Sequence, residues 1–190
     1  MKTKIFIISG PSGSGKTSIL KRLFRRVRIA RSFFKVPTYT TRSPRKGERN
    51  SIDYCFLTKG DFLKLKQKDC FFETKKYLDN FYATPKNFLS QAFSRNAHPF
   101  LCIDVQGALK IKKKFKNAAV LIFVAPPSEK ILKLRLKQRR TEDADILKKR
   151  LRIAKKEVKY AEKYHYRLVN NNLKDIVDAL ENILLKEISF

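Results

Sequence analysis

The stretch GPSGSGKT, residues 10–17, decides the fold of this 190-residue chain. It fits the pattern Gly-x-x-x-x-Gly-Lys-Ser/Thr, in which glycines let successive backbone N–H groups point at the oxygens of a bound phosphate. The apolar run KIFIIS (4–9) precedes it, and apolar residues at helical spacing begin at Thr17. A strand, a glycine loop and a helix in this order favour nucleoside triphosphate binding over a glycine-rich turn with a chance lysine.

Each residue type in this loop has a chemical role. Lys16 is expected to bridge the terminal phosphates, the Thr17 hydroxyl to ligate Mg²⁺, and the helix N-terminus to add its dipole. The loop alone fits ATP or GTP. The expected triphosphate-binding residues are Gly10, Pro11, Ser12, Gly13, Ser14, Gly15, Lys16, Thr17 and Ser18.

Strands and helices alternate along much of the remaining chain. Two further apolar runs, FLCID (100–104) and AVLIFVA (119–125), flank a helical stretch at 106–115, and the strand-like YRLVN (166–170) precedes an amphipathic helix at 173–188. This order predicts an α/β fold with a parallel sheet. Residues 128–160 are expected to be almost wholly helical, and 36–92, which break the alternation, to be an insertion.

Charge and composition limit the classes of partner and site. Lys and Arg number 44 against 17 Asp and Glu, giving a net charge of +27, and the first acid is Glu48. This excess favours anionic partners, nucleotides or nucleic acids, although part of it is also explained by drift of surface residues toward lysine. Three separated cysteines and two histidines predict neither a zinc site nor a disulfide framework.

No segment resembles a signal peptide or a membrane span. The first apolar run is too short for a signal peptide, and the longest, at 118–125, is expected to be a strand. We therefore expect a cytoplasmic protein without membrane contact.

A basic segment, TYTTRSPRKGERNSIDY (38–54), limits the functions that the insertion can have. Arg42 and Arg45, with Pro44 between them, can form a fork for a second phosphate, or can belong to an ordinary exposed basic loop. The segment resembles the T-T-R-x-P-R-x-G-E segment of guanylate kinases and the aspartate-tyrosine pair that follows it. The motifs FFE (71–73), NFYAT (80–84), IDVQG (103–107), VAPPS (124–128) and LVNNN (168–172) then appear in the order of that family.

The resemblance covers the whole chain. It implies a P-loop nucleoside monophosphate kinase fold and ATP-dependent phosphorylation of GMP to GDP, a step of purine metabolism, by a monomer or homodimer. It divides the single domain into a core (1–36, 93–127 and 160–190), a GMP-binding lobe of about 37–92 and a helical lid of about 128–159.

The resemblance also implies roles for individual residues. The GMP phosphate would be held by Thr38, Arg42, Arg45, Tyr54 and Tyr82. Guanine would be read by Glu73, Thr84 and Asp104, since carboxylates accept from guanine N1–H and its 2-amino group, a donor pair that adenine lacks. Without the resemblance, Glu73 reads as a surface charge and Asp104 as a strand-end cap.

The catalytic set that the resemblance implies would be Lys16, Arg42 and the lid arginines Arg135, Arg139 and Arg150. Asn170 would lie near the adenine, or is simply a turn former.

One departure from the family pattern concerns magnesium. The strand that usually reads Asp-x-Asp here reads Cys102-Ile-Asp104, so the acid that helps to order the water shell of Mg²⁺ is missing. If residues 102 and 104 share one side of a strand, magnesium binding or turnover is weakened, unless Cys102 merely packs and another acid serves.

Three other functions remain open at this point. A related kinase of ribose bisphosphates would not need the guanine-reading residues, and a protein-binding module derived from this fold would not need Lys16 and the lid arginines. Nucleic-acid contact through charge alone is a side property that we do not predict as the function.

Overall fold

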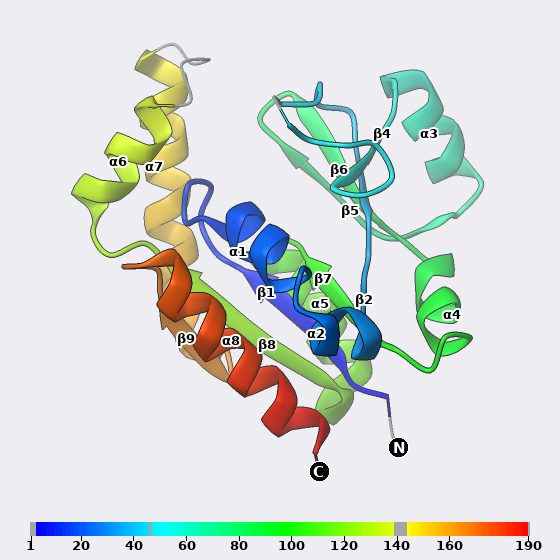
Figure 1. Cartoon of the computed structure of the whole chain (residues 1–190). Helices are drawn as coiled ribbons and strands as arrows, with labels where there is room; N and C mark the ends of the chain where they lie inside the picture. The colour runs from blue at the N-terminus through cyan, green and yellow to red at the C-terminus, as the bar shows by residue number, and fades with distance from the viewer. Residues whose placement is uncertain (1–2, 46, 139–143, 190) are drawn as a thin grey trace.

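The computed structural model describes residues 3–45, 47–138 and 144–189 and contains two sheets. The first sheet is wholly parallel, with strand order β2-β7-β1-β8-β9 (Figure 1). Its strands are β1 (Ile5–Ser9), β2 (Phe33–Lys35), β7 (His98–Cys102), β8 (Ala119–Ala125) and β9 (Tyr166–Val169). The predicted α/β class with a parallel core is confirmed.

Helices cover both faces of the first sheet, because the side chains of β1 alternate between two apolar clusters. Ile5 and Ile7 pack in the cluster that includes α5, whereas Phe6 and Ile8 pack in the cluster that includes α1 and α8. The helices of these layers are α1 (Lys16–Leu23), α2 (Val27–Ser32), α5 (Val105–Phe115) and α8 (Leu173–Ile188). Two short 3₁₀ segments, η1 (Lys116–Ala118) and η2 (Lys159–Lys163), precede β8 and β9.

A smaller second sheet is built from the region that breaks the sequence alternation. Its strand order is β4-β3-β6-β5, and it lies to one side of the first sheet together with α3 (Figure 1). Its elements are β3 (Thr38–Thr40), β4 (Tyr54–Phe56), α3 (Lys59–Gln67), β5 (Phe71–Tyr77) and β6 (Asn80–Pro85). Phe62, Phe71 and Ala83 form a separate small core there. The chain returns through α4 (Asn87–Phe93) to the first sheet.

Two helices stand on the other side of the first sheet (Figure 1). They are α6 (Glu129–Lys137) and α7 (Ala144–Val158), and the Ser128 side chain caps α6 by accepting from the Ile131 amide. Leu132 and Leu136 of α6 join Ala154 of α7 in a small apolar cluster. The sequence prediction of a helical segment at 128–160 agrees with these two elements.

The structure corrects two details of the predicted elements. The helical spacing after Thr17 runs on without interruption in the sequence, but the helix ends at Leu23, a second begins at Val27, and Phe33 enters an edge strand that pairs with β7. The strand predicted at 100–104 ends at Cys102, because the Asp104 side chain accepts from the amides of Gln106 and Gly107 and so begins α5.

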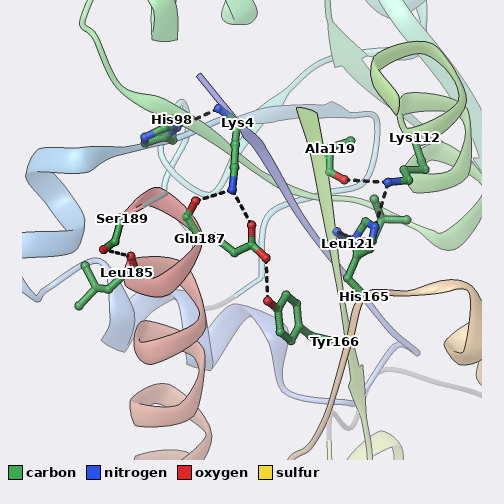
Figure 2. A network of polar contacts seen from close by, with 10 residues as sticks. All are labelled: Lys4, His98, Lys112, Ala119, Leu121, His165, Tyr166, Leu185, Glu187 and Ser189. Atoms are coloured by element: carbon green, nitrogen blue, oxygen red, sulfur yellow. Dashed lines mark hydrogen bonds and ion pairs between the residues drawn. The ribbon is translucent and has the colours of Figure 1, made fainter. Parts of the chain in front are cut away.

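Polar contacts connect α8 to the first sheet, and strands of that sheet to one another, at the end of the molecule where the termini lie (Figure 2). Lys4 Nζ binds Glu187 at 2.8 Å, and the Tyr166 hydroxyl donates to the same carboxylate at 2.7 Å. Both histidines accept backbone amides through Nδ1: His98 from Lys4 at 3.0 Å and His165 from Leu121 at 2.8 Å.

Every helix in the described ranges is too short or too polar to span a lipid bilayer.

Candidate functional site

A cleft lies where the carboxyl ends of β1 and β7 meet the second sheet and α7. Ligands of open parallel sheets bind at this edge. The lining residues are Gly10, Ser12, Gly13, Gly15, Lys16, Thr17, Ser18, Thr38, Arg42, Arg45, Tyr54, Glu73, Lys75, Tyr77, Tyr82, Ala83, Thr84, Cys102, Ile103, Asp104, Arg150 and Glu157. The expected triphosphate loop and the expected GMP residues therefore face the same space.

The loop of residues 10–17, here called the P-loop, needs its glycines for two reasons. Gly10, Gly13 and Gly15 have φ values of +146°, +92° and +96°, which other residues rarely adopt. In addition, a Cβ on Gly10 would overlap the Val124 carbonyl, and one on Gly13 would lie 2.8 Å from Leu132 Cδ1. The loop is therefore wedged between β8 and α6.

Phosphate and Mg²⁺ fit this loop chemically. Lys16 Nζ donates to the carbonyl oxygens of Gly10 and Pro11, so the ammonium lies within the loop, and Thr17 places its hydroxyl in the first turn of α1. No acidic side chain occupies that first turn. Backbone amides of the loop, an ammonium and a hydroxyl at a helix N-terminus are the donor set that a magnesium triphosphate requires.

Two predicted residues lie behind the P-loop and do not line the cleft. The buried Asn170 donates through Nδ2 to the Ser14 carbonyl at 2.7 Å, and Arg135 Nη2 donates to the Asn170 carbonyl at 3.1 Å. Together they connect α6 and the end of β9 to the P-loop. Pro11 and Ser14 also belong to the loop without lining the cleft.

Arg150 reaches the P-loop from α7. Its Nη1 donates to Ser12 Oγ at 3.1 Å, and its guanidinium lies 6.0 Å from the centre of the Tyr77 ring at the end of β5. Arg150 thus touches both the triphosphate loop and the second sheet. Arg139 lies outside the described residues.

Arg42 and Arg45 form a basic cluster in the part of the cleft that the second sheet and its loops line. Glu48 holds the Arg42 guanidinium with two hydrogen bonds of 2.8 and 3.0 Å, and that guanidinium lies 5.1 Å from the centre of the Tyr54 ring. Desolvation lowers the pKa of Arg45, and the positive charges of Arg42 and Arg150 lower it further. An anion bound among the three guanidinium groups would relieve this repulsion. Thr38, Tyr54 and Tyr82 line the cleft beside them.

Two carboxylates, Glu73 and Asp104, line another part of the same cleft. Thr84 Oγ1 donates to Glu73 Oε1 at 2.9 Å, and the Glu73 carboxyl group packs against Gly107, where an added Cβ would lie 3.2 Å from the carboxyl carbon. Burial raises the pKa of Glu73, and the charge of Asp104 raises it further. Asp104 caps α5 and also lines the cleft, so the two roles considered for it, a cap and a residue that reads guanine, are compatible.

The cleft also holds one acid that the sequence did not single out. Glu157 of α7 lines it; burial raises the pKa of this carboxyl group, while the charges of Lys16 and Lys75 act in the opposite direction. Burial likewise raises the pKa of the Cys102 thiol, while the charges of Lys16 and Lys35 act to lower it. The charge of Lys16 in the P-loop therefore acts on both Glu157 and Cys102.

Sequence reasoning also missed Lys75, Tyr77 and Gly107. Strand alternation was an available signal for the first two, because residues 73, 75 and 77 share one face of β5. Within the described ranges, no group of three or more His, Cys, Asp and Glu side chains is arranged to hold a metal ion.

The comparisons with known proteins point to one family. The profile of the guanylate kinase family matches residues 2–187. A guanylate kinase of Clostridium perfringens is 40% identical over 183 residues, covering 96% of this chain and 83% of its own length. One from the Wolbachia of Brugia malayi is 36% identical, covering 96% of this chain and 92% of its own length. The crystal structure of guanylate kinase from Anaplasma phagocytophilum superimposes with a TM-score of 0.79 at 29% identity, over 97% of this chain and 86% of that one.

Proposed function

The chain belongs to the guanylate kinase family, and we propose that its cleft catalyses the ATP-dependent phosphorylation of GMP to GDP with the residues assigned below. One observation carries the assignment: the P-loop and two carboxylates, Glu73 and Asp104, line the same cleft. The P-loop suits the donor triphosphate, and the carboxylates suit the two N–H donors of guanine. The reaction is a step of purine nucleotide metabolism.

ATP would bind on the side of the first sheet. Amides of the P-loop and Lys16 would hold its β- and γ-phosphates, with Asn170 and Arg135 supporting the loop from behind. The Thr17 hydroxyl would hold Mg²⁺, which neutralises charge on the bridging phosphate oxygens when bound.

GMP would bind on the side of the second sheet. Arg42 and Arg45 would take its phosphate, with Thr38, Tyr54 and Tyr82 beside them, and Glu48 fixes the Arg42 fork in advance. Guanine would enter between Glu73, on β5 of the second sheet, and Asp104, which caps α5 beside the first sheet. Residues 37–92 would thus be the GMP-binding lobe and 128–159 the lid of a single domain.

The chemistry needs positioning and electrostatics more than proton transfer. The acceptor phosphate is already an anion, so its oxygen attacks the γ-phosphorus in line without a general base. Arg150, which contacts the P-loop and lies near the ring of Tyr77, is placed to meet the transferring phosphoryl group and to neutralise charge on its equatorial oxygens. Closure of the GMP-binding lobe and lid around the substrates would also exclude water and so suppress ATP hydrolysis.

The rival functions predict different features of the cleft. A kinase of base-free ribose phosphates has no use for the Glu73–Thr84 pair, and a binding module that lacks catalysis has no use for Lys16 and Arg150. Nucleic-acid contact through net charge would not depend on the cleft and would fall steeply as salt rises.

The direct test is coupled turnover of ATP with GMP, AMP, CMP, UMP or no acceptor, across a magnesium series. We expect ADP formation only with GMP. Equal turnover with several bases, or ATP hydrolysis without an acceptor, would contradict the residue assignment. Binding of GMP without turnover would support the binding module.

A further inference from the structure

An ion pair in the cleft joins the second sheet to the start of α5. Lys75 Nζ of β5 lies 2.8 Å from Oδ1 of Asp104, the residue that caps α5. The two side chains are 27% and 22% exposed, so the pair is partly shielded from solvent. Partial burial strengthens such a contact relative to one on an open surface.

The pair also fixes the Asp104 carboxylate. Oδ1 accepts from Lys75 and, at 2.7 and 3.3 Å, from the amides of Gln106 and Gly107. Three donors on one oxygen hold the carboxylate in one orientation and leave its other oxygen to face a ligand.

Lys75 is close to the second carboxylate as well. Glu73 lies two residues earlier on the same face of β5, and both side chains line the cleft. The charge of Asp104 raises the pKa of Glu73, whereas Lys75 and Lys110 of α5 act to lower it. Glu157 of α7 and Tyr164, which follows η2, also lie within the field of Asp104, and Thr84 of β6 hydrogen-bonds Glu73.

We propose that Lys75 is a positioning residue for guanine recognition, which orients Asp104 and keeps Asp104 and Glu73 together as hydrogen-bond acceptors. This inference rests on the guanine-reading role proposed for those two acids. Guanine presents two N–H donors on one edge, so a protonated carboxyl group at either position would oppose a donor with a donor. The Lys75 ammonium offsets the repulsion between two neighbouring carboxylates, which would otherwise favour uptake of a proton.

The test compares Lys75→Met with Lys76→Met. Lys76 is the next residue of β5 and is exposed, so its variant removes one positive charge from the same strand outside the cleft. For each protein, kcat/KM is measured with GMP and with IMP, which lacks the 2-amino group, over a range of pH, and ADP affinity is measured separately.

We expect Lys75→Met to lower kcat/KM for GMP about tenfold, the usual loss for one hydrogen bond to a charged group. The acid limb of its pH profile should move to higher pH, because Glu73 loses a charge that lowers its pKa. The preference for GMP over IMP should shrink, while ADP affinity stays unchanged. Lys75→Arg should restore the wild-type values.

Three results would overturn the proposal: a pH profile of Lys75→Met that matches Lys76→Met, an equal loss with GMP and IMP, or Lys75→Arg behaving like Lys75→Met. If Lys75→Met melts at a lower temperature, Lys75→Gln replaces it in the same comparison. Failure of the proposed function is a separate result, because wild-type protein would then show no preference for GMP.

Discussion

The Thr84 hydroxyl donates a 2.9 Å hydrogen bond to Oε1 of Glu73, its paired residue across β5 and β6. The pairing register of the second sheet therefore sets which way the carboxylate points. The carboxyl group of Glu73 also packs against Gly107 of α5. A ligand that enters between the two sheets meets a carboxylate whose orientation is already fixed.

Replacing Glu73 with Gln should separate GMP recognition from ATP binding. Gln keeps the shape but loses the charge and presents an amide donor where guanine requires acceptors, so kcat/KM for GMP should fall roughly 10- to 150-fold. Steady-state kinetics with GMP and calorimetry with ADP measure the two effects. Glu162→Gln, at an exposed acid, is the control. Unchanged GMP kinetics would rule out the guanine role of Glu73.

Gly107→Ala tests the same pocket from the helix side. Ala is favoured over Gly inside a helix by about 0.5–1 kcal/mol, so we expect the melting temperature to be kept or raised. The new Cβ would lie 3.2 Å from the Glu73 carboxyl carbon, so Glu73 must move and KM for GMP should rise. Gly60→Ala in α3, where the new Cβ would lie 3.8 Å from Thr58 Oγ1, is the control for the effect of helix stability alone. A stabilised Gly107→Ala protein with wild-type KM would contradict the proposed pocket.

Local patterns in the sequence predicted most of the first sheet, but not how the lobes meet. AVLIFVA was predicted as a strand and forms β8 with the same bounds, and LKDIVDALENILLKEI forms α8, because continuous burial and helical periodicity are local signals. The edge strand β2 was missed, since its three residues continue a helical spacing and become a strand only by pairing with β7. The resemblance supplied Glu73 and Asp104. Gly107 and Glu157 became visible only when β5, α5 and α7 were brought together in space.

Arg150→Met should remove a contribution made mainly in the transition state. An arginine that neutralises the transferring phosphoryl group contributes about a thousandfold or more to kcat in related enzymes, so kcat should fall by that order while ADP affinity changes little. Arg152→Met, on an exposed position of the same helix, is the matched control. Single-turnover kinetics with GMP measure the effect. A loss in ADP affinity with kcat preserved would instead indicate that Arg150 acts through its contact with Ser12.

Protein stability should fall in mild acid because of the two histidines. His98 and His165 each accept a backbone amide through Nδ1, and burial lowers the pKa of both below the ordinary value of 6.5. The unfolded chain therefore binds more protons near and below pH 6.5, so the free energy of unfolding decreases as the pH falls from 6.5 through the folded-state pKa values. Paired carboxylates such as Glu187, whose pKa is lowered, contribute only below about pH 4.5.

Urea unfolding from pH 8 to pH 5 measures this loss. In a double variant, His98→Asn and His165→Asn, the Asn side-chain oxygen replaces Nδ1 as the acceptor and does not titrate. The variant should show no decline in the free energy of unfolding between pH 7 and pH 5. A decline as steep as that of the wild type would assign the acid sensitivity to other groups.

Cys102→Asp should reduce the magnesium requirement of the enzyme. Cys102 ends β7 beside Ile8 of β1 and lines the cleft, and the raised pKa of its thiol keeps it uncharged at neutral pH. A carboxylate there can accept from magnesium-bound water, a type of contact whose loss costs about 10- to 100-fold in metal affinity elsewhere. We expect tighter binding of Mg²⁺·ADP by calorimetry, unchanged binding of ADP without metal, and no effect of the control Cys102→Ser. Glu157→Gln should enlarge the gain if Glu157 is the acid that now serves. Weaker Mg²⁺·ADP binding by Cys102→Asp would contradict this prediction. Burying the carboxylate would then cost more free energy than its contact with the metal-bound water provides, and residue 102 would take no part in holding magnesium.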